Sequence, residues 1–417
     1  MKKLLCILLT AVLFTGCANT NQIPQITKGY QADQQVTNLE ETGTAEEILA
    51  NRRKIVMDEM RDMMSLLWSP TETFTYDIMG ENDPDEPITF IKGKIYSGIP
   101  YTTGNASRSA FLSYATKQEN GVYTLEGVSG EIMTGGQIPR IGNYCSSAVF
   151  WAWARVSNSI SFTLTKFMTP LYGCVQVGDY VYGGSNYDDI ATSQICQENG
   201  EDVMFASYAQ LLPGDAMVYR TGSGGHTVMI MDVEVVYTAG GKIDPERSTV
   251  TIVDQAISTL REQPTTYVEG VGEVVLCEKL DRVWTFETIF KQGYLPITCQ
   301  ELIDPSPLEP VTVTDYTDAP TVDNMFKGTI QSSYKISHIT VDIYNEKGGL
   351  VQTATCYSVM NEKYTFNMYR FVQETEQPAI QGNMDIDALP GGSYRCVFTA
   401  RMSTGDDIIF RDFTFEK

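Results

Sequence analysis

The sequence has little positive charge, and its acidic excess limits what it can bind. Its 417 residues include 30 Lys and Arg against 52 Asp and Glu. An apparent export signal at the start carries Lys2 and Lys3, so the mature balance is 28 basic against 52 acidic residues, or −24. A chain this acidic lacks the basic surface that binds phosphate backbones, so we expect no nucleic-acid partner.

Motifs for metals and cofactors are also missing. The sequence has no Cys-x-x-Cys, no pair of histidines at helical spacing and no Walker-type glycine loop. The glycine-rich turn at 222–225 leads into an apolar strand pattern rather than a helix, unlike the loops that cradle phosphates. We therefore expect no metal ion and no cofactor.

Long apolar runs are absent except at the start of the chain. Two lysines precede an apolar run from Leu4 to Phe14, which is typical of a secretory signal and too short to span a bilayer comfortably. The residues Phe14-Thr15-Gly16-Cys17 resemble the bacterial lipobox, in which the Cys becomes the lipidated first residue.

The lipobox predicts how the protein is held. We expect a lipoprotein signal over 1–17 with Cys17 as the lipidation site, and a polar, flexible tether over 18–44. The protein would then lie outside the cytoplasm, with its lipid anchor in a bacterial membrane. Ordinary secretion and a retained anchor are the alternatives.

A proline-rich stretch divides the rest of the chain. Three prolines within 301–311 predict a stiff linker, because proline fixes the backbone and removes a donor. Before it, 45–300 mixes short strands with helices predicted over 45–68 and 146–159. After it, 312–417 reads as strand after strand.

The last segment has the features of an immunoglobulin-like sandwich. Ile339, Val341 and Ile343 alternate with polar residues, as in a strand with one buried face. Residues 387–394 look like the corner of such sandwiches, where a Tyr hydroxyl ties back to the backbone. The fold class expected for the whole chain is therefore α+β, with an all-β sandwich at its end.

Histidine is so scarce that it narrows the search for catalytic groups. The sequence contains only His226 and His338, and general-base catalysis near neutral pH most often uses this side chain. His338 falls within a predicted sandwich strand, where we expect a surface residue. His226 follows a glycine-rich turn and opens an apolar strand, so its ring should project near a sheet edge. A structural histidine is the alternative.

One cysteine stands where a nucleophile is expected. Cys145 comes directly before the predicted helix that begins with Ser146. A thiol at a helix N-terminus faces unpaired backbone N–H groups and the positive end of the dipole, which favour the thiolate and supply an oxyanion site. A small buried residue that starts a core helix is the alternative.

A third group would fix the imidazole. The strand that follows the His226 strand ends in Asp254 and Gln255, and either side chain can reach back towards the ring if the two strands are antiparallel. We favour Asp254 over Gln255, with a solvent-facing Asp as the alternative. The six remaining cysteines after residue 145 either form disulfides, Cys174 with Cys196 being the most local pair, or stay reduced.

Four pieces in this order resemble the NlpC-type cell-wall peptidases, a papain-like family. They are Gly98-Ile-Pro-Tyr101, Cys145-Ser146 at the helix start, Pro213-Gly-Asp215 before a strand, and Gly225-His226. The resemblance covers roughly 88–298. It implies a papain-like catalytic domain over 45–300 that hydrolyses a peptide or amide bond, with a peptidoglycan-derived peptide as its substrate.

The resemblance also implies residue roles. Cys145 would be the nucleophile, His226 the base and Asp254 the residue that orients the ring, while Tyr101 would contact the oxyanion or the substrate. Tyr144, Ser146 and Gln255 would support the site or bind substrate. The family usually has Asp-Cys-Ser-Gly where this chain has Tyr144-Cys145-Ser146-Ser147, so an acidic group that helps recognise a peptide amine is missing.

Two rival functions remain open. The first is an inactive, surface-binding lipoprotein that uses the papain-like body and the sandwich to hold a carbohydrate or protein ligand. The second is a transglutaminase-like acyl transfer, which is also built on Cys, His and Asp. The 44 positions between Tyr101 and Cys145, and a second unusual stretch over 172–206, are insertions that could wall the cleft.

Overall fold

The computed structural model describes a defined part of the chain. The described residues are 41, 43–76, 87–102, 106–112, 114–126, 132–133, 141–157, 160, 165, 168–183, 190–221, 224–308, 311–332, 336–356, 365–367, 380–382, 384–402 and 407–417. The predicted signal, Cys17 and most of the tether lie outside these residues. Within them, no helix is long and apolar enough to cross a membrane.

Two hydrophobic cores organise the described residues. The first gathers side chains between Val56 and Leu302, and the second gathers side chains between Met325 and Phe415. The first core combines helices with sheets, whereas the elements around the second are strands. The chain is therefore of mixed α+β class, as its sequence pattern predicts.

The first body contains α-helices and short 3₁₀ helices. In chain order they are α1 (Ala45–Ser65), α2 (Arg108–Leu112), α3 (Cys145–Trp153), η2 (Pro170–Tyr172), α4 (Thr192–Asn199), α5 (Glu201–Tyr208), α6 (Ile257–Glu262), α7 (Phe286–Gln292) and η4 (Gln300–Leu302), where η2 and η4 are the 3₁₀ helices.

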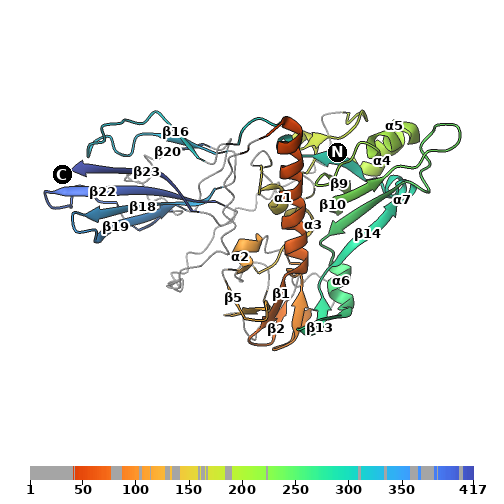
Figure 1. Cartoon of the computed structure of the whole chain (residues 1–417), viewed down its shortest axis with the longest axis horizontal. Helices are drawn as coiled ribbons and strands as arrows, with labels where there is room; N and C mark the ends of the chain where they lie inside the picture. The colour runs from red at the N-terminus through yellow and green to blue at the C-terminus, as the bar shows by residue number, and fades with distance from the viewer. Residues whose placement is uncertain are drawn as a thin grey trace, which may run out of the picture. The chain divides into compact units, whose positions relative to one another are not determined.

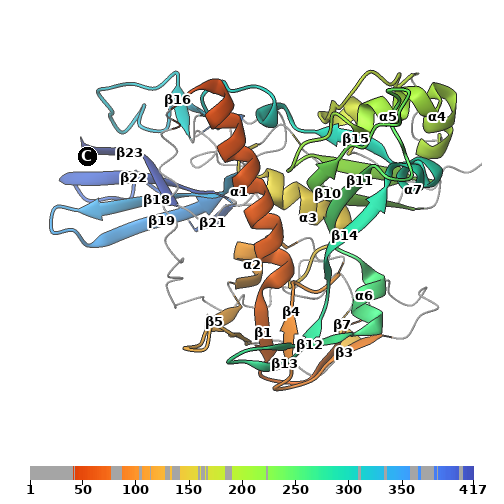
Figure 2. The ribbon, with the colours of Figure 1, turned by 45° about the vertical axis from the view of Figure 1, so that its right-hand side comes forward.

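A six-stranded sheet in the order β14-β11-β10-β9-β15-β8 forms the centre of this body. Its strands are β8 (Val175–Gln176), β9 (Ala216–Arg220), β10 (Gly225–Glu234), β11 (Thr249–Asp254), β14 (Lys279–Thr285) and β15 (Leu295–Thr298). The apolar helix α3 packs against β10, and α1 packs against α3, as Figures 1 and 2 both show. This layering buries the inner face of the sheet.

A second six-stranded sheet, β12-β13-β4-β1-β6-β5, lies beside a three-stranded sheet, β3-β2-β7. Their strands are β1 (Leu67–Pro70), β2 (Phe74–Tyr76), β3 (Ile88–Phe90), β4 (Ile95–Ser97), β5 (Ala115–Lys117), β6 (Tyr123–Leu125), β7 (Ile132–Met133), β12 (Thr265–Val268) and β13 (Gly272–Leu276). Trp68 stacks on Tyr96 with 5.0 Å between ring centroids and anchors this part of the core.

The C-terminal body consists of a five-stranded sheet, β21-β19-β18-β22-β23, and a three-stranded sheet, β16-β17-β20. The strands are β16 (Thr312–Thr314), β17 (Thr329–Gln331), β18 (Ile336–Asn345), β19 (Leu350–Cys356), β20 (Thr365–Asn367), β21 (Ile380–Gly382), β22 (Ser393–Met402) and β23 (Asp407–Glu416). Ile339, Val341 and Ile343 are fully buried, as their alternation predicts. The Tyr394 hydroxyl donates to the Pro390 carbonyl at 2.8 Å, which is the predicted corner.

Two predicted helices are shorter than their sequence patterns suggest. The first ends at Ser65 rather than at position 68, because Leu67–Pro70 pairs with two strands as β1. The second ends at Trp153 rather than at 159, because the amides of Arg155 and Val156 bond three residues back and close a tight turn. Sheet pairing and turn formation outweigh helical periodicity at these ends.

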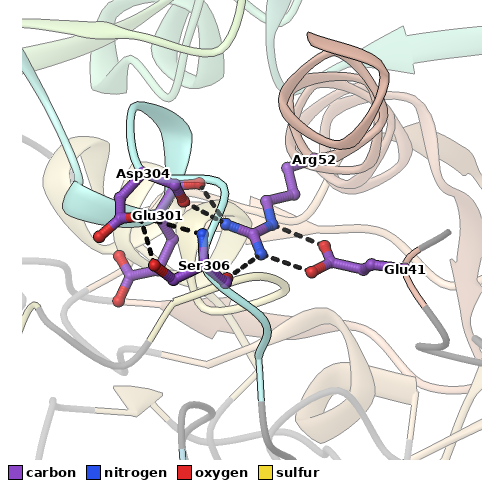
Figure 3. Close-up of polar contacts among 5 residues, drawn as sticks. All are labelled: Glu41, Arg52, Glu301, Asp304 and Ser306. Carbon is purple, nitrogen blue, oxygen red and sulfur yellow. Dashed lines mark hydrogen bonds and ion pairs between the residues drawn. The ribbon is translucent and has the colours of Figure 1, made fainter. Parts of the chain in front are cut away.

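The start of the predicted linker is bound to α1. Figure 3 shows the guanidinium of Arg52, which is fully buried, between the Glu41 carboxylate and the linker backbone. Nη1 donates to the carbonyls of Glu301 (2.9 Å) and Asp304 (2.6 Å), and Nη2 donates to the Ser306 carbonyl (2.6 Å). Nη2 and Nε also donate to the two carboxylate oxygens of Glu41. All five N–H donors are therefore satisfied, and these contacts hold the backbone of 301–306 against α1.

We expect Arg52→Met to destabilise the first body by roughly 2–4 kcal/mol, because three carbonyls and a carboxylate lose their donors in a buried site. The matched control is Lys54→Met, which removes an exposed ion pair with Asp58 and should cost less than about 0.5 kcal/mol. The four tryptophans, at positions 68, 151, 153 and 284, all lie before the linker, so their fluorescence during urea unfolding reports this body. Equal unfolding midpoints for the two variants would contradict the expectation.

Candidate active site

Cys145 is the first residue of α3, and its side chain is buried. Tyr144 precedes it with extended backbone (φ −126°, ψ 172°), and the Ser147 hydroxyl accepts from the Tyr144 amide at 2.8 Å. This cap fixes the start of the nine-residue helix at the thiol. The sulfur therefore meets the positive end of the helix dipole, as the sequence predicts.

His226 and Asp254 come from neighbouring strands. Strands β10 and β11 pair antiparallel, so the start of β10 and the end of β11 lie at the same end of the sheet. His226 Nε2 lies 2.6 Å from Asp254 Oδ2. The Cys145 thiol lies close enough to the His226 ring for hydrogen bonding and charge to shift the pKa of both groups. The structure thus brings Cys145, His226 and Asp254 together at one site.

Arg282 is a fourth member that the sequence did not reveal. Its Nη1 donates to both carboxylate oxygens of Asp254, at 3.2 and 3.0 Å. The guanidinium also lies over the Trp284 ring, 5.2 Å from its centroid. The Asp254 carboxylate is 1% exposed, so the imidazole and the guanidinium between them replace its lost water.

The electrostatics favour a thiolate paired with an imidazolium. Burial raises the pKa of the Cys145 thiol, but the hydrogen bond and charge of His226, with hydrogen bonds from Thr227 and Thr165, outweigh it and lower the pKa. Burial lowers the pKa of His226, but Asp254 and Cys145 more than compensate and raise it to about 9. Burial likewise opposes ionisation of Asp254, yet His226 and Arg282 hold its pKa below the ordinary value.

The other cysteines differ sharply from Cys145. The seven described cysteines are buried and none of them is in a disulfide, so the reduced alternative is the one that the structure has. Burial raises the pKa of the Cys196 thiol to about 12. It also raises the pKa of Cys174, Cys277, Cys299 and Cys396. Cys145 combines the same burial with a lowered pKa, which marks it as chemically distinct.

Tyr101 reaches the site although 44 positions separate it from Cys145. The intervening chain forms α2 and strands β5 to β7 and then returns, so that Tyr101 forms a β-bridge with Asn143. Gly142 allows this close approach, because a Cβ there would lie 2.4 Å from the Pro100 carbonyl oxygen. Burial and the Cys145 charge raise the pKa of the Tyr101 phenol, which keeps it a proton donor.

Gln255 and Ser146 support the site from behind. The Gln255 amide, fully buried, donates to the Ile99 carbonyl and to Asn143 Oδ1, each at 2.7 Å. It therefore holds the Tyr101 segment and the Cys145 segment together and does not face His226. The buried Ser146 hydroxyl accepts from Thr165 at 3.0 Å, and the Thr165 hydroxyl lies 3.8 Å from the Cys145 sulfur.

The remaining predicted residues lie as follows. Tyr144 is half-buried, close enough to Tyr101 for their charges to interact. His338 is half-buried in β18, where burial lowers its pKa, and has no part in the arrangement around Cys145. In the second unusual stretch, Tyr180 is buried in the core and bonds the Pro296 carbonyl at 3.0 Å, while Tyr187 lies outside the described residues.

Sequence reasoning missed Arg282, Thr165 and Glu278. Arg282 reaches Asp254 through the pairing of β14 with β11, in which it lies opposite Ile252, and no local pattern encodes that register. Glu278 is buried, bonds the Ala256 amide at 2.8 Å, and has a pKa that burial raises well above the usual range. A buried carboxyl with a raised pKa near Asp254 has no sequence signature.

The comparisons with known proteins leave the family undecided. No protein-family model matches the chain, and no curated protein matches it. Among solved structures, the chain is similar to CopC from Methylosinus trichosporium OB3b, with 14% identity over 26% of this chain and 89% of that one and a TM-score of 0.15. A score this low supports no inference. Within the described residues, no group of three or more His, Cys, Asp or Glu could hold a metal ion.

We expect Cys145 in the folded protein to react with iodoacetamide at pH 6 faster than any other cysteine, since its thiol has the lowered pKa. His226→Ala should slow this reaction at least tenfold, because losing the imidazolium lets burial raise the pKa. His338→Ala, the other histidine, is the matched control and should leave the rate unchanged. Peptide mapping by mass spectrometry measures each rate, and equal rates in the two variants would refute the assignment.

Proposed function

We propose that the chain is a cysteine hydrolase that cleaves a peptide or amide bond through Cys145, His226 and Asp254. The observation that carries the proposal is the convergence of three groups. The Cys145 thiol stands at the start of α3, the His226 ring lowers the pKa of that thiol, and the buried Asp254 carboxylate lies 2.6 Å from His226 Nε2. A thiolate is the nucleophile in this arrangement, and the third group fixes the orientation of the ring.

The reaction would proceed in two halves. The Cys145 thiolate attacks the amide carbonyl, and the oxygen that becomes negative lies at the N-terminus of α3, where the Tyr101 hydroxyl can also donate. The His226 imidazolium gives its proton to the leaving nitrogen, so the C–N bond breaks and a thioester remains. Neutral His226 then takes a proton from water, which attacks the thioester and releases the acid and the thiolate.

Three features support a papain-like body and a cell-wall substrate. The first is the order of the NlpC-like pieces in the sequence. The second is their placement, since the Gly98–Tyr101 segment, the start of α3 and the start of β10 converge on one site. The third is the lipobox, which would tether the protein outside the cytoplasm beside the cell wall. We accordingly propose peptidoglycan-derived peptides as substrates of a lipid-anchored, extracytoplasmic enzyme.

Cys145→Ala should lower hydrolysis of cell-wall muropeptides, or of a model amide, by about 10³-fold or more, because it removes the nucleophile. Alanine is smaller than cysteine and introduces no clash at the start of the helix. Tryptophan fluorescence should therefore report an unfolding midpoint close to that of the unchanged chain. Cys356→Ala, at a buried thiol of the C-terminal body, is the control and should keep full activity.

Each outcome of this comparison decides between functions. Turnover that persists in Cys145→Ala would end the proposal. A folded, unchanged chain that hydrolyses nothing and whose Cys145 resists iodoacetamide would favour the inactive binding lipoprotein. Incorporation of a labelled amine into the acyl product, in place of hydrolysis, would favour transglutaminase-like transfer.

The alkaline limb of the pH profile should follow His226. Its pKa of about 9 means that the ring loses its proton, and with it the ability to protonate the leaving nitrogen, as the pH rises through this value. In Asp254→Asn the carboxylate that raises this pKa is gone, so the limb should move to lower pH and kcat/KM should fall by at least tenfold. A limb that stays in place would contradict the assigned role of Asp254.

A further inference from the structure

Arg282 has more hydrogen-bonding capacity than its contact with Asp254 uses. Nη1 alone spans both oxygens of Asp254, and the face of the guanidinium rests on Trp284. Among the described residues nothing accepts a hydrogen bond from Nε or Nη2. The side chain is 35% exposed, so this unused edge can meet a molecule from solvent.

The use of arginine at this position is informative. Holding one buried carboxylate through a single nitrogen needs only a point charge, which a lysine would also supply. The planar fork of a guanidinium can bind a second carboxylate with two parallel hydrogen bonds. Stacking on Trp284 fixes the plane of the fork, which leaves less side-chain entropy to lose on binding.

Arg282 lies beside His226, so its unused N–H groups are on the side of the site where His226 acts. Arg282 and His226 bind the same carboxylate, and both reach solvent, with 35% and 24% of their side chains exposed. In the proposed reaction His226 protonates the leaving nitrogen, so the leaving part of the substrate lies on the His226 side of the site. An acidic group on that part would be close to the guanidinium.

The surrounding charges favour an anion there. Glu278 is buried within range of the charges of Asp254, Cys145 and Tyr101, and burial raises its pKa well above the ordinary value, which favours its neutral form. Arg261 on α6 contributes a second positive charge within reach of Tyr101. The rest of the chain is strongly acidic, with a net charge of −22 over the full sequence. A positive site on a negative protein selects acidic ligands locally while its remaining surface repels them.

We propose that Arg282 forms an anion subsite for a carboxylate that the substrate carries on its leaving side, close to the scissile bond. This inference rests on the proposed hydrolase function. It names the substrate class as acyl compounds whose leaving amine bears an acidic group, and it makes Arg282 a specificity residue besides its contact with Asp254.

Two alkylating reagents of nearly equal size test the subsite without any substrate. Iodoacetate carries a carboxylate and iodoacetamide a neutral amide, and both form the same S–C bond to the Cys145 thiolate with loss of iodide. Both rate constants are proportional to the fraction of Cys145 that is present as thiolate. The ratio of the iodoacetate rate to the iodoacetamide rate therefore does not change when the pKa of Cys145 changes. The ratio therefore reports how strongly the site attracts an anion, which a role confined to holding Asp254 would not alter.

At pH 7 and low salt we expect Arg282→Gln to lower this ratio about threefold to tenfold, as the loss of one charge several ångströms away implies. Arg247→Gln is the matched control, because Arg247 is an exposed arginine of the same body that pairs with Asp244, and it should leave the ratio unchanged. Arg282→Lys keeps the charge without the fork and should give an intermediate ratio. Added salt should lower the ratio in the unchanged chain.

The outcomes separate the two proposals. If Cys145 remains the fast-reacting cysteine but Arg282→Gln and Arg282→Lys both keep the original ratio, the anion subsite is refuted and the hydrolase proposal stands. If Cys145 reacts no faster than the other cysteines with either reagent, the hydrolase proposal fails and the subsite fails with it. Tryptophan fluorescence identifies a misfolded Arg282→Gln variant, in which case the lysine variant and the salt dependence decide.

Discussion

The arrangement at the site depends on one buried carboxylate that two cations share. Asp254 is almost completely removed from water, and such a group stays ionised only when partners replace its hydration. His226 and Arg282 do so from neighbouring strands of one sheet. The same negative charge raises the pKa of His226 and, through the imidazolium, lowers the pKa of Cys145. The ionisation of the Cys145 thiol thus depends on a carboxylate that acts on it through His226.

The fold supplies this geometry through long-range pairings rather than through one continuous segment. The antiparallel pair of β10 and β11 brings His226 to Asp254, and the bridge between Tyr101 and Asn143 closes the loop of the first insertion. Gln255 then joins the two ends of that loop from inside the core. Because the ends are fixed, the 44 positions between Tyr101 and Cys145 can hold extra strands without displacing the thiol.

Sequence patterns predict part of this site, and the missing part has a physical cause. Chemistry that depends on a residue and its immediate neighbours, such as Cys145 at a helix start and His226 at a strand start, is visible in the sequence. The order of β10 and β11 predicts their contact, and Asp254 rather than Gln255 does face His226. No local pattern predicts Arg282, because it reaches Asp254 through the register of β14 on β11. The raised pKa of Glu278 depends on burial, which only the folded chain defines.

The limits of local pattern are equally clear in the helices and the linker. Helical periodicity in the sequence continues past Ser65 and Trp153. In the structure, the residues after Ser65 pair as a strand and those after Trp153 form a tight turn. Prolines predict a linker near position 301, yet they do not indicate that its carbonyls bind Arg52. That contact also holds Glu41, so the end of the predicted tether and the start of the linker share one buried guanidinium. Arg52 thus joins Glu41 and the linker backbone to α1, which packs on the helix that carries Cys145.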